Sequence, residues 1–153
     1  DMSKPANLPP VTISTNDYDR LAWIATAGMM SRRAPPVAEM LADELVRATV
    51  VAANAVPPSA VTMHSRVEFR DETTGQTSRL TLVYPGEDDG DTGLISVLTP
   101  IGTALIGLSE GQSIRWRTAT GEWKTLTVLR VLYQPQRMAL HGVLEPYAAV
   151  DSG

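Results

Sequence analysis

Residues 94–111, LISVLTPIGTALIGLSEG, constrain the fold more than any other stretch, because strong local signals follow one another without a gap. Residues 95–98 are mostly β-branched or apolar and predict a strand. Thr99 can cap a helix, and Pro100 suits its first turn because the N–H that proline lacks has no partner there. Apolar residues then recur at helical spacing, and Gly111 can adopt the positive φ that often follows a helix. The segment predicts a strand, a tight turn and a short helix with one apolar side.

Strand patterns surround this unit. Val67 and Phe69 alternate with charged residues, and Ile114 and Trp116 alternate with arginines. A period of two is typical of half-buried strands. In residues 126–133 the apolar alternation slips by one position, which either a β-bulge or a strand buried on both faces would explain. Together these patterns predict an α+β fold, with a small antiparallel sheet packed on one short helix.

Two amphipathic segments precede the strands. Thr15 or Asn16 is placed to cap a first helix, and a second helix is predicted from Pro36 to about Ala53. Because the loop between them is short, the two helices should form an antiparallel helical hairpin. The chain is therefore predicted to consist of a flexible lead (1–14), a short helical hairpin (15–56), a sheet domain (60–135) and a loose tail (136–153).

Composition narrows the classes of protein. The chain contains no cysteine, which excludes a disulfide framework and thiolate metal sites and suits the cytoplasm. No apolar run approaches the roughly 20 residues of a membrane span, so we expect no membrane association. The net charge of −4 argues against direct, sequence-specific binding to bare nucleic acid. We expect a cytoplasmic monomer whose partner is a protein or a protein–nucleic acid machine.

No pattern nominates an enzyme active site. His64 and His141 lie in different segments without metal-ligand spacing, and the acidic residues 87–91 lack the layout of a calcium-binding EF-hand loop. Glycine-rich phosphate-binding motifs are absent from the sequence. We therefore predict no catalytic residues, no metal ligands and no cofactor.

Several separated strings, in order, resemble one known family. Residues 99–112, TPIGTALIGLSEGQ, resemble the signature of the C-terminal domain of the Gre transcript-cleavage factors, GreA and GreB. Residues 61–67, 82–85 and 128–135 extend the resemblance on both sides. With the short N-terminal segment, residues 11–135 look most similar to the Rnk branch, the "regulator of nucleoside diphosphate kinase" proteins related to Gre factors. The resemblance implies an FKBP-like fold for the sheet domain.

The resemblance also implies a docking site. In Gre factors a Ser-Pro turn docks on the rim of the secondary channel of RNA polymerase. Here Pro100 and Gly102 match that turn, and Thr99 stands in place of the serine. Together with Ile101, these residues are the predicted polymerase-binding residues, although the same Thr-Pro pair would start the helix in any case.

The tip of the helical hairpin differs from the Gre pattern. In Gre factors acidic residues at the tip of a long coiled coil hold a catalytic metal ion. Here the predicted tip is Ser31, Arg32 and Arg33, without a carboxylate, and arginine does not coordinate Mg²⁺. The arginines are either solvated or in contact with acidic groups of the polymerase. Transcript cleavage by this chain is not expected.

The resemblance thus implies a non-catalytic regulator of transcription elongation that binds RNA polymerase near the secondary channel and competes with Gre factors. Three alternatives remain open. The FKBP-like fold suggests a prolyl isomerase, although Phe69 is the only phenylalanine in the sequence. The others are an active cleavage factor and an adaptor protein that binds a kinase or another enzyme.

Overall fold

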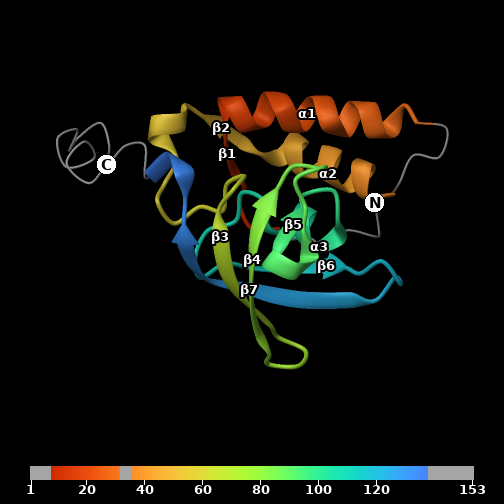
Figure 1. Ribbon diagram of the computed structural model, residues 1–153, viewed down its shortest axis with the longest axis vertical. Helices are drawn as coiled ribbons and strands as arrows, with labels where there is room; N and C mark the ends of the chain where they lie inside the picture. The colour runs from red at the N-terminus through yellow and green to blue at the C-terminus, as the bar shows by residue number, and fades with distance from the viewer. Residues whose placement is uncertain (1–7, 32–35, 138–153) are drawn as a thin grey trace.

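A computed structural model describes residues 8–31 and 36–137 of the 153-residue chain. Within these residues, a helical hairpin lies beside a curled sheet (Figure 1). The elements in chain order are β1 (Thr12–Ser14), α1 (Thr15–Met29), α2 (Pro36–Arg47), β2 (Thr49–Val51), the 3₁₀ turn η1 (Ala53–Ala55), β3 (Arg66–Asp71), β4 (Thr77–Val83), the 3₁₀ turn η2 (Gly90–Thr92), β5 (Leu94–Ser96), α3 (Pro100–Leu105), β6 (Ser113–Arg117) and β7 (Trp123–Tyr133). The α+β class predicted from the sequence is confirmed.

The main sheet has the strand order β5–β4–β3–β7–β6. Its β4–β3, β3–β7 and β7–β6 ladders are antiparallel, as the sequence predicted. The β4–β5 ladder is parallel, with Thr81 opposite Leu94 and Val83 opposite Ser96. The loop after Val83 carries the chain back along β4, so β5 starts beside that strand and runs in the same direction. The edge strand β5 is thus the exception to the antiparallel arrangement.

A β-bulge explains the slipped alternation in the last strand. On the β3–β7 ladder, Glu68 lies opposite Arg130, whereas Phe69 lies opposite Val128. Leu129 is the extra residue at this shift, and Leu132 is extra at a second one, because Val67 lies opposite Val131 and Arg66 opposite Tyr133. Val128 and Val131 can therefore both face the core. Of the two explanations that the sequence left open, the structure shows the bulge.

Helix α1 begins one residue earlier than predicted. The Asp17 N–H donates to Ser14 Oγ at 3.1 Å, so Ser14 is the cap in place of Thr15 or Asn16. Ser14 can serve because it ends β1 in an extended conformation, with φ of −70° and ψ of 155°.

Helix α2 ends at Arg47, whereas the sequence predicted a helix continuing to about Ala53. Residues 49–51 instead form β2 and pair in parallel with β1, with Thr12 opposite Thr49. This prediction was wrong because β-branched residues gain more from pairing with a neighbouring strand than from another helical turn.

Helix α3 ends at Leu105, although apolar spacing predicted a longer helix. Gly107 has a φ of +81° and turns the chain away from the helix axis. Gly111 has a φ of +86°, as the sequence predicted. The sequence therefore identified one of the two glycines that turn this segment.

The helical hairpin and the sheet share one hydrophobic core. Helix α1 contributes Leu21 and α2 contributes Leu41, both fully buried. They belong to the same cluster as Leu105 of α3 and Leu126 and Val128 of β7. The hairpin is consequently packed on the sheet rather than suspended from a linker.

The flexible lead predicted for residues 1–14 and the loose tail predicted for residues 136–153 are both shorter in the structure. Val11 and Ile13 are 0% and 2% exposed and belong to the core. At the other end, Gln136 Oε1 accepts from the Thr62 hydroxyl at 2.9 Å. The rest of both predictions concerns residues 1–7 and 138–153, which lie outside the described residues.

Candidate functional site

The corner at the start of α3 is held by its own hydrogen bonds. Thr99 Oγ1 accepts from the Gly102 N–H at 3.0 Å and donates to the Ser96 carbonyl at 2.7 Å. The Thr99 side chain therefore caps α3 and ties it to the end of β5. Pro100 occupies the first turn of the helix, as the sequence predicted.

Thr103 and Leu98 hold the corner from both sides. The Thr103 N–H donates to the Thr99 carbonyl at 2.9 Å, and the Thr103 hydroxyl lies 3.1 Å from that oxygen and 3.0 Å from the Pro100 carbonyl oxygen. The Leu98 N–H donates to Ser96 Oγ at 3.0 Å. Because the backbone is fixed at both ends, the corner presents its side chains in one arrangement.

The corner is partly accessible rather than sealed in the core. Residues 98–101 are half-buried. Gly102 is buried, and a β-carbon there would lie 2.5 Å from the Ser96 carbonyl oxygen. Gly102 therefore allows the close packing of the corner, and only residues 98–101 are accessible for contact with a partner. Leu98 was not among the predicted docking residues, and it adds apolar surface.

The described part of the hairpin tip consists of one apolar and one polar residue, both exposed. Met30 is 82% exposed just after α1, and Ser31 is exposed beside it. Arg32 and Arg33, the other predicted tip residues, lie outside the described residues. Helix α1 has 15 residues, which corresponds to a length of about 22 Å. The hairpin is therefore short.

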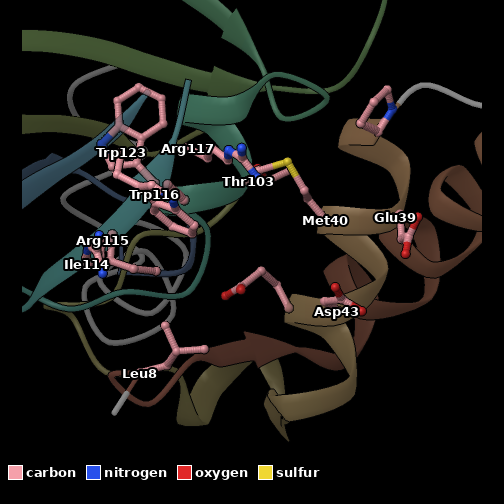
Figure 2. Close-up of a pocket in the computed structure, with 13 residues that line it drawn as sticks. Leu8, Glu39, Met40, Asp43, Thr103, Ile114, Arg115, Trp116, Arg117 and Trp123 are labelled. Carbon is pink, nitrogen blue, oxygen red and sulfur yellow. The ribbon is translucent and has the colours of Figure 1, made fainter. Parts of the chain in front are cut away.

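A cavity of about 330 Å³, which the sequence did not suggest, separates α2 from the β6–β7 hairpin. Figure 2 shows Trp116 and Trp123 on the sheet side, and Glu39 and Asp43 across from them on α2. Trp116 Nε1 is buried without a hydrogen-bond partner among the described residues. The sheet side of the cavity carries the two tryptophans together with Arg115 and Arg117, and the α2 side is acidic (Figure 2). No local motif connects the two sides in sequence.

A cluster of polar side chains joins α1 to the sheet. Asp17 accepts hydrogen bonds from the Tyr84 hydroxyl and from the Met63 N–H, both at 3.3 Å. Glu87 Oε1 accepts from the Tyr84 N–H at 2.9 Å and lies 2.9 Å from His64 Nε2. The contact of His64 with Glu87 connects the segment before β3 with the loop after β4.

The pKa values of the two carboxyl groups of this cluster, Asp17 and Glu87, are shifted in opposite directions. Burial raises the pKa of Asp17, against the hydrogen bonds from Met63 and Tyr84, which lower it. The hydrogen bond from His64, followed by that from the Tyr84 N–H, lowers the pKa of Glu87. Asp17, whose pKa is raised, stabilises the folded state at low pH, and this stabilisation is lost as the pH rises through its folded-state pKa. Glu87, whose pKa is lowered, stabilises the folded state at higher pH, and this stabilisation is lost as the pH falls through its folded-state pKa.

We therefore expect opposite pH dependence from Asp17→Asn and Glu87→Gln. The stability of the wild-type protein relative to Asp17→Asn should fall as pH rises above the ordinary aspartate value of 3.8. Its stability relative to Glu87→Gln should fall as pH decreases below the ordinary glutamate value of 4.5. Urea unfolding over a pH series measures both, and each variant is the control for the other. Slopes of the same sign would contradict the assignment.

The described part of the chain lacks two kinds of feature. Within residues 8–31 and 36–137, no helix has the length and apolar character needed to cross a bilayer. The same residues contain no group of three or more histidine, aspartate or glutamate side chains placed to hold a metal ion.

Two known families match along the sequence. Residues 9–51 match the family described as "Rnk N-terminus", and residues 56–133 match "Transcription elongation factor, GreA/GreB, C-term". The chain is 36% identical over 132 residues to the "Regulator of nucleoside diphosphate kinase" of Escherichia coli strain K12, covering 84% of this chain and 93% of that protein. It is 46% identical over 57 residues to "Transcription elongation factor GreA" of Syntrophobacter fumaroxidans, covering 37% of this chain and 36% of that protein.

A solved structure agrees with these matches. The "prokaryotic transcription elongation factor GreA/GreB from Nitrosomonas europaea" superposes with a TM-score of 0.64 at 37% identity, covering 82% of this chain and 99% of that chain. The sheet and its corner are thus those of a GreA/GreB C-terminal domain. With the matching N-terminal segment and the similarity to the Escherichia coli regulator, the chain belongs to the Rnk family. The resemblance found in the sequence is confirmed, and the protein is a regulator related to Gre factors.

Proposed function

We propose that this protein is a non-catalytic regulator of transcription elongation that binds RNA polymerase near the secondary channel and competes there with Gre factors. Its membership of a family related to Gre factors supports this function, because the relatives are named as regulators or elongation factors and not as enzymes. The protein acts in the cytoplasm as a monomer, and it needs no cofactor.

The observation that carries the proposal is the corner at residues 98–101. These residues are partly exposed, and the hydrogen bonds of Thr99 and Thr103 fix their backbone before any partner binds. A surface that is already ordered loses little conformational entropy on binding. The corner is therefore suited to dock on a large partner with a small contact area.

The short helical hairpin determines what the protein does once it has docked. With α1 about 22 Å long, the hairpin occupies the mouth of the channel without reaching the catalytic centre. Its tip sequence at residues 31–33 carries no carboxylate to hold a catalytic metal ion. Occupying the mouth without supplying a metal ligand makes the protein a competitor of Gre factors and not a cleavage factor.

Pro100→Asn tests the docking site. We expect the affinity for core RNA polymerase to fall about tenfold or more, equivalent to about 1.4 kcal/mol, because the variant loses the rigid ring that residues 98–101 present. Pro58→Asn, at an exposed proline outside the corner, is the matched control and should bind like the wild-type protein. Surface plasmon resonance with immobilised core polymerase measures all three proteins.

Three results of that experiment would count against the proposal. Equal affinity of Pro100→Asn and the wild-type protein would remove the corner as the docking site. Absence of wild-type binding would remove the proposed function itself. If saturating GreA fails to displace the bound protein, the two do not compete for one site.

The cavity beside α2 favours a second candidate, a prolyl isomerase of the FKBP type. Trp116 and Trp123 give it an aromatic wall of the kind that holds a proline ring. Glu39 and Asp43 line the opposite side, however, and place charged groups where an apolar ring would need a dry surface. We therefore favour the function of a transcription regulator over that of a prolyl isomerase or of an adaptor for another enzyme.

A further inference from the structure

We propose that the outer face of the main sheet is a second docking surface, which binds an acidic segment of a partner protein. This surface, called the arginine face below, lies on strands β4, β3, β7 and β6 and on the turn after β3. Its charged residues are Arg66, Arg70, Arg79, Arg115, Arg117 and Arg130, with Glu68 and Glu72 among them. The inference goes beyond the proposed function and does not depend on it.

Alternation on β3 places the first of these residues on one side of the sheet. Val67 and Phe69 are 0% and 9% exposed and point into the core. Arg66, Glu68 and Arg70 alternate with them and therefore point to the opposite side. The charged residues of β3 thus lie on the face that is turned away from the helices.

Ion pairs join the arginines of neighbouring strands on this face. The Glu68 carboxylate lies between Arg79 of β4 and Arg130 of β7, with N–O distances of 2.9 and 3.4 Å. Arg70 pairs with Glu72 at 3.0 Å. The side chains of Arg70, Arg79 and Arg130 are nevertheless 42%, 56% and 62% exposed, so a partner can reach the guanidinium groups.

The arginine face continues to the edge strand β6. Glu72 accepts from the Thr127 hydroxyl, and Thr127 Oγ1 lies 2.7 Å from Ser113 Oγ on β6. Arg115 and Arg117 follow Ser113 at intervals of two residues and share its side of the strand. The face therefore extends over four neighbouring strands, which corresponds to a width of about 14 Å.

The charge of the arginine face opposes that of the whole molecule. Six arginines and two glutamates leave an excess of four positive charges, although the complete chain has a net charge of −4. Part of the opposite charge lies in the acidic residues 87–91. A local excess of positive charge orients a negatively charged partner during its approach. The face is therefore complementary to a negatively charged surface.

The residue types suit a protein interface. All six cations are arginines, whose planar guanidinium groups bind carboxylates through two parallel hydrogen bonds. Trp123 of β7 is 38% exposed and lies opposite Arg117 of β6. The guanidinium groups of Arg115 and Arg117 lie 4.8 and 5.6 Å from the centre of its ring. Tryptophan and arginine are the types most enriched among residues that dominate binding energy.

An acidic protein segment fits this surface better than a nucleic acid does. A phosphate backbone carries uninterrupted negative charge, which the Glu68 carboxylate between two strands and the Glu72 carboxylate at the turn after β3 would repel. A protein segment can place separate carboxylates against the arginines and neutral groups against the two glutamates. The net charge of −4 also opposes a uniform polyanion at long range.

The arginine face and the Thr99 corner lie on different sides of the sheet. Leu105 of α3 packs in the core with Leu126 and Val128 of β7, so α3 covers the inner side. On β4, β3 and β7 the arginine face is the outer side, and at the β6 edge Arg115 and Arg117 also line the cavity beside α2 (Figure 2). An acidic segment bound over β4, β3 and β7 therefore leaves the corner free.

Binding of a fluorescent oligoglutamate peptide to the full chain, measured by fluorescence anisotropy, tests the proposal. The double variant Arg115→Gln with Arg117→Gln should bind the peptide about tenfold more weakly. The matched control is Arg20→Gln with Arg137→Gln, which removes the same charge outside the arginine face and should change affinity by less than about twofold. Circular dichroism confirms that both double variants remain folded.

Three outcomes would overturn the inference. If a single-stranded oligonucleotide of the same charge binds more tightly than the oligoglutamate peptide, the face is a nucleic-acid site. If both double variants lose affinity equally, only net charge matters and the face has no special role. If the wild-type protein does not bind the peptide at low salt, the surface is only a solvated sheet face.

Discussion

Replacing Gly107 by alanine is expected to lower the free energy of unfolding by about 3 kcal/mol or more. Gly107 has a φ of +81°, which a residue with a β-carbon adopts only with strain. A β-carbon there would overlap Val11 Cγ1 and would lie 3.2 Å from the Thr12 nitrogen. Because one of these neighbours is backbone and the other is a core side chain, neither can move aside easily. Urea unfolding monitored by tryptophan fluorescence measures the loss.

Gly111→Ala is the matched control. Gly111 has nearly the same conformation, with a φ of +86°, but nothing lies within 4 Å of an added β-carbon. Its substitution should therefore show only the conformational penalty, about 1 kcal/mol. Equal losses in the two variants would show that the close approach at Gly107 contributes nothing.

The expected size of the Gly107 effect follows from the position of the residue between three segments. Its N–H donates to the Val61 carbonyl at 2.8 Å, and its carbonyl accepts from the Thr12 N–H at 3.0 Å. The residue therefore joins the end of α3, the strand before α1 and the chain that enters the sheet. A change there disturbs the position of the helical hairpin on the sheet as well as the local turn.

The elements that could be predicted from sequence are those whose signals are local. The Thr99 cap and the proline after it depend on residues close together in the chain, and both are present as predicted. Gly111 has the predicted positive φ, although the helix that it was expected to end stops at Leu105. The bulge near Leu129 was one of two predicted explanations, because a slip in alternation is visible within a single strand. Local signals are sufficient where the conformation itself is local.

The elements that were missed depend on distant partners. Residues 49–51 form a strand only because β1 lies beside them, and β5 is parallel only because a loop returns along β4. Gly107 is required because Val11 packs against it. No window of the sequence contains these partners, so local pattern could not predict them.

The two docking surfaces differ in the same way. The corner at residues 98–101 is continuous in sequence and could be proposed from its motif. The arginine face is assembled from separate strands, and the alternation of Arg66, Glu68 and Arg70 alone indicates only that one strand has a charged side. The strand order is needed to show that Arg79, Arg130 and the β6 arginines share that side.

Gln134 connects the end of β7 to the segment that follows the helical hairpin. Its side chain is 0% exposed, and Nε2 donates to the Pro57 carbonyl at 2.9 Å and to the Ala60 carbonyl at 2.8 Å. Its Oε1 is buried without a partner among the described residues. A buried amide with two good donated bonds holds residues 57–60 against the sheet despite the unpaired acceptor.

Gln134→Ala should lower the free energy of unfolding by about 3 kcal/mol, because it opens a cavity and removes the Gln134 donor from the Ala60 carbonyl. The Pro57 carbonyl also loses that bond but keeps the one from the Ala60 N–H at 3.0 Å. Gln134→Met keeps most of the volume and removes only the donated hydrogen bonds, so its loss should be smaller, about 1–2 kcal/mol. Urea unfolding measures both variants. A methionine variant as stable as the wild-type protein would show that the two bonds contribute nothing.

The same unfolding curves examine how the hairpin and the sheet are coupled. Because Leu21 and Leu41 share a core with Leu126, we expect one cooperative transition in the wild-type protein and in both Gln134 variants. The hairpin would then hold a fixed orientation relative to the corner whenever the protein is folded. A separate early transition of the helices, seen by circular dichroism before the tryptophan signal changes, would instead mean that the two parts are independent domains joined at residues 56–60.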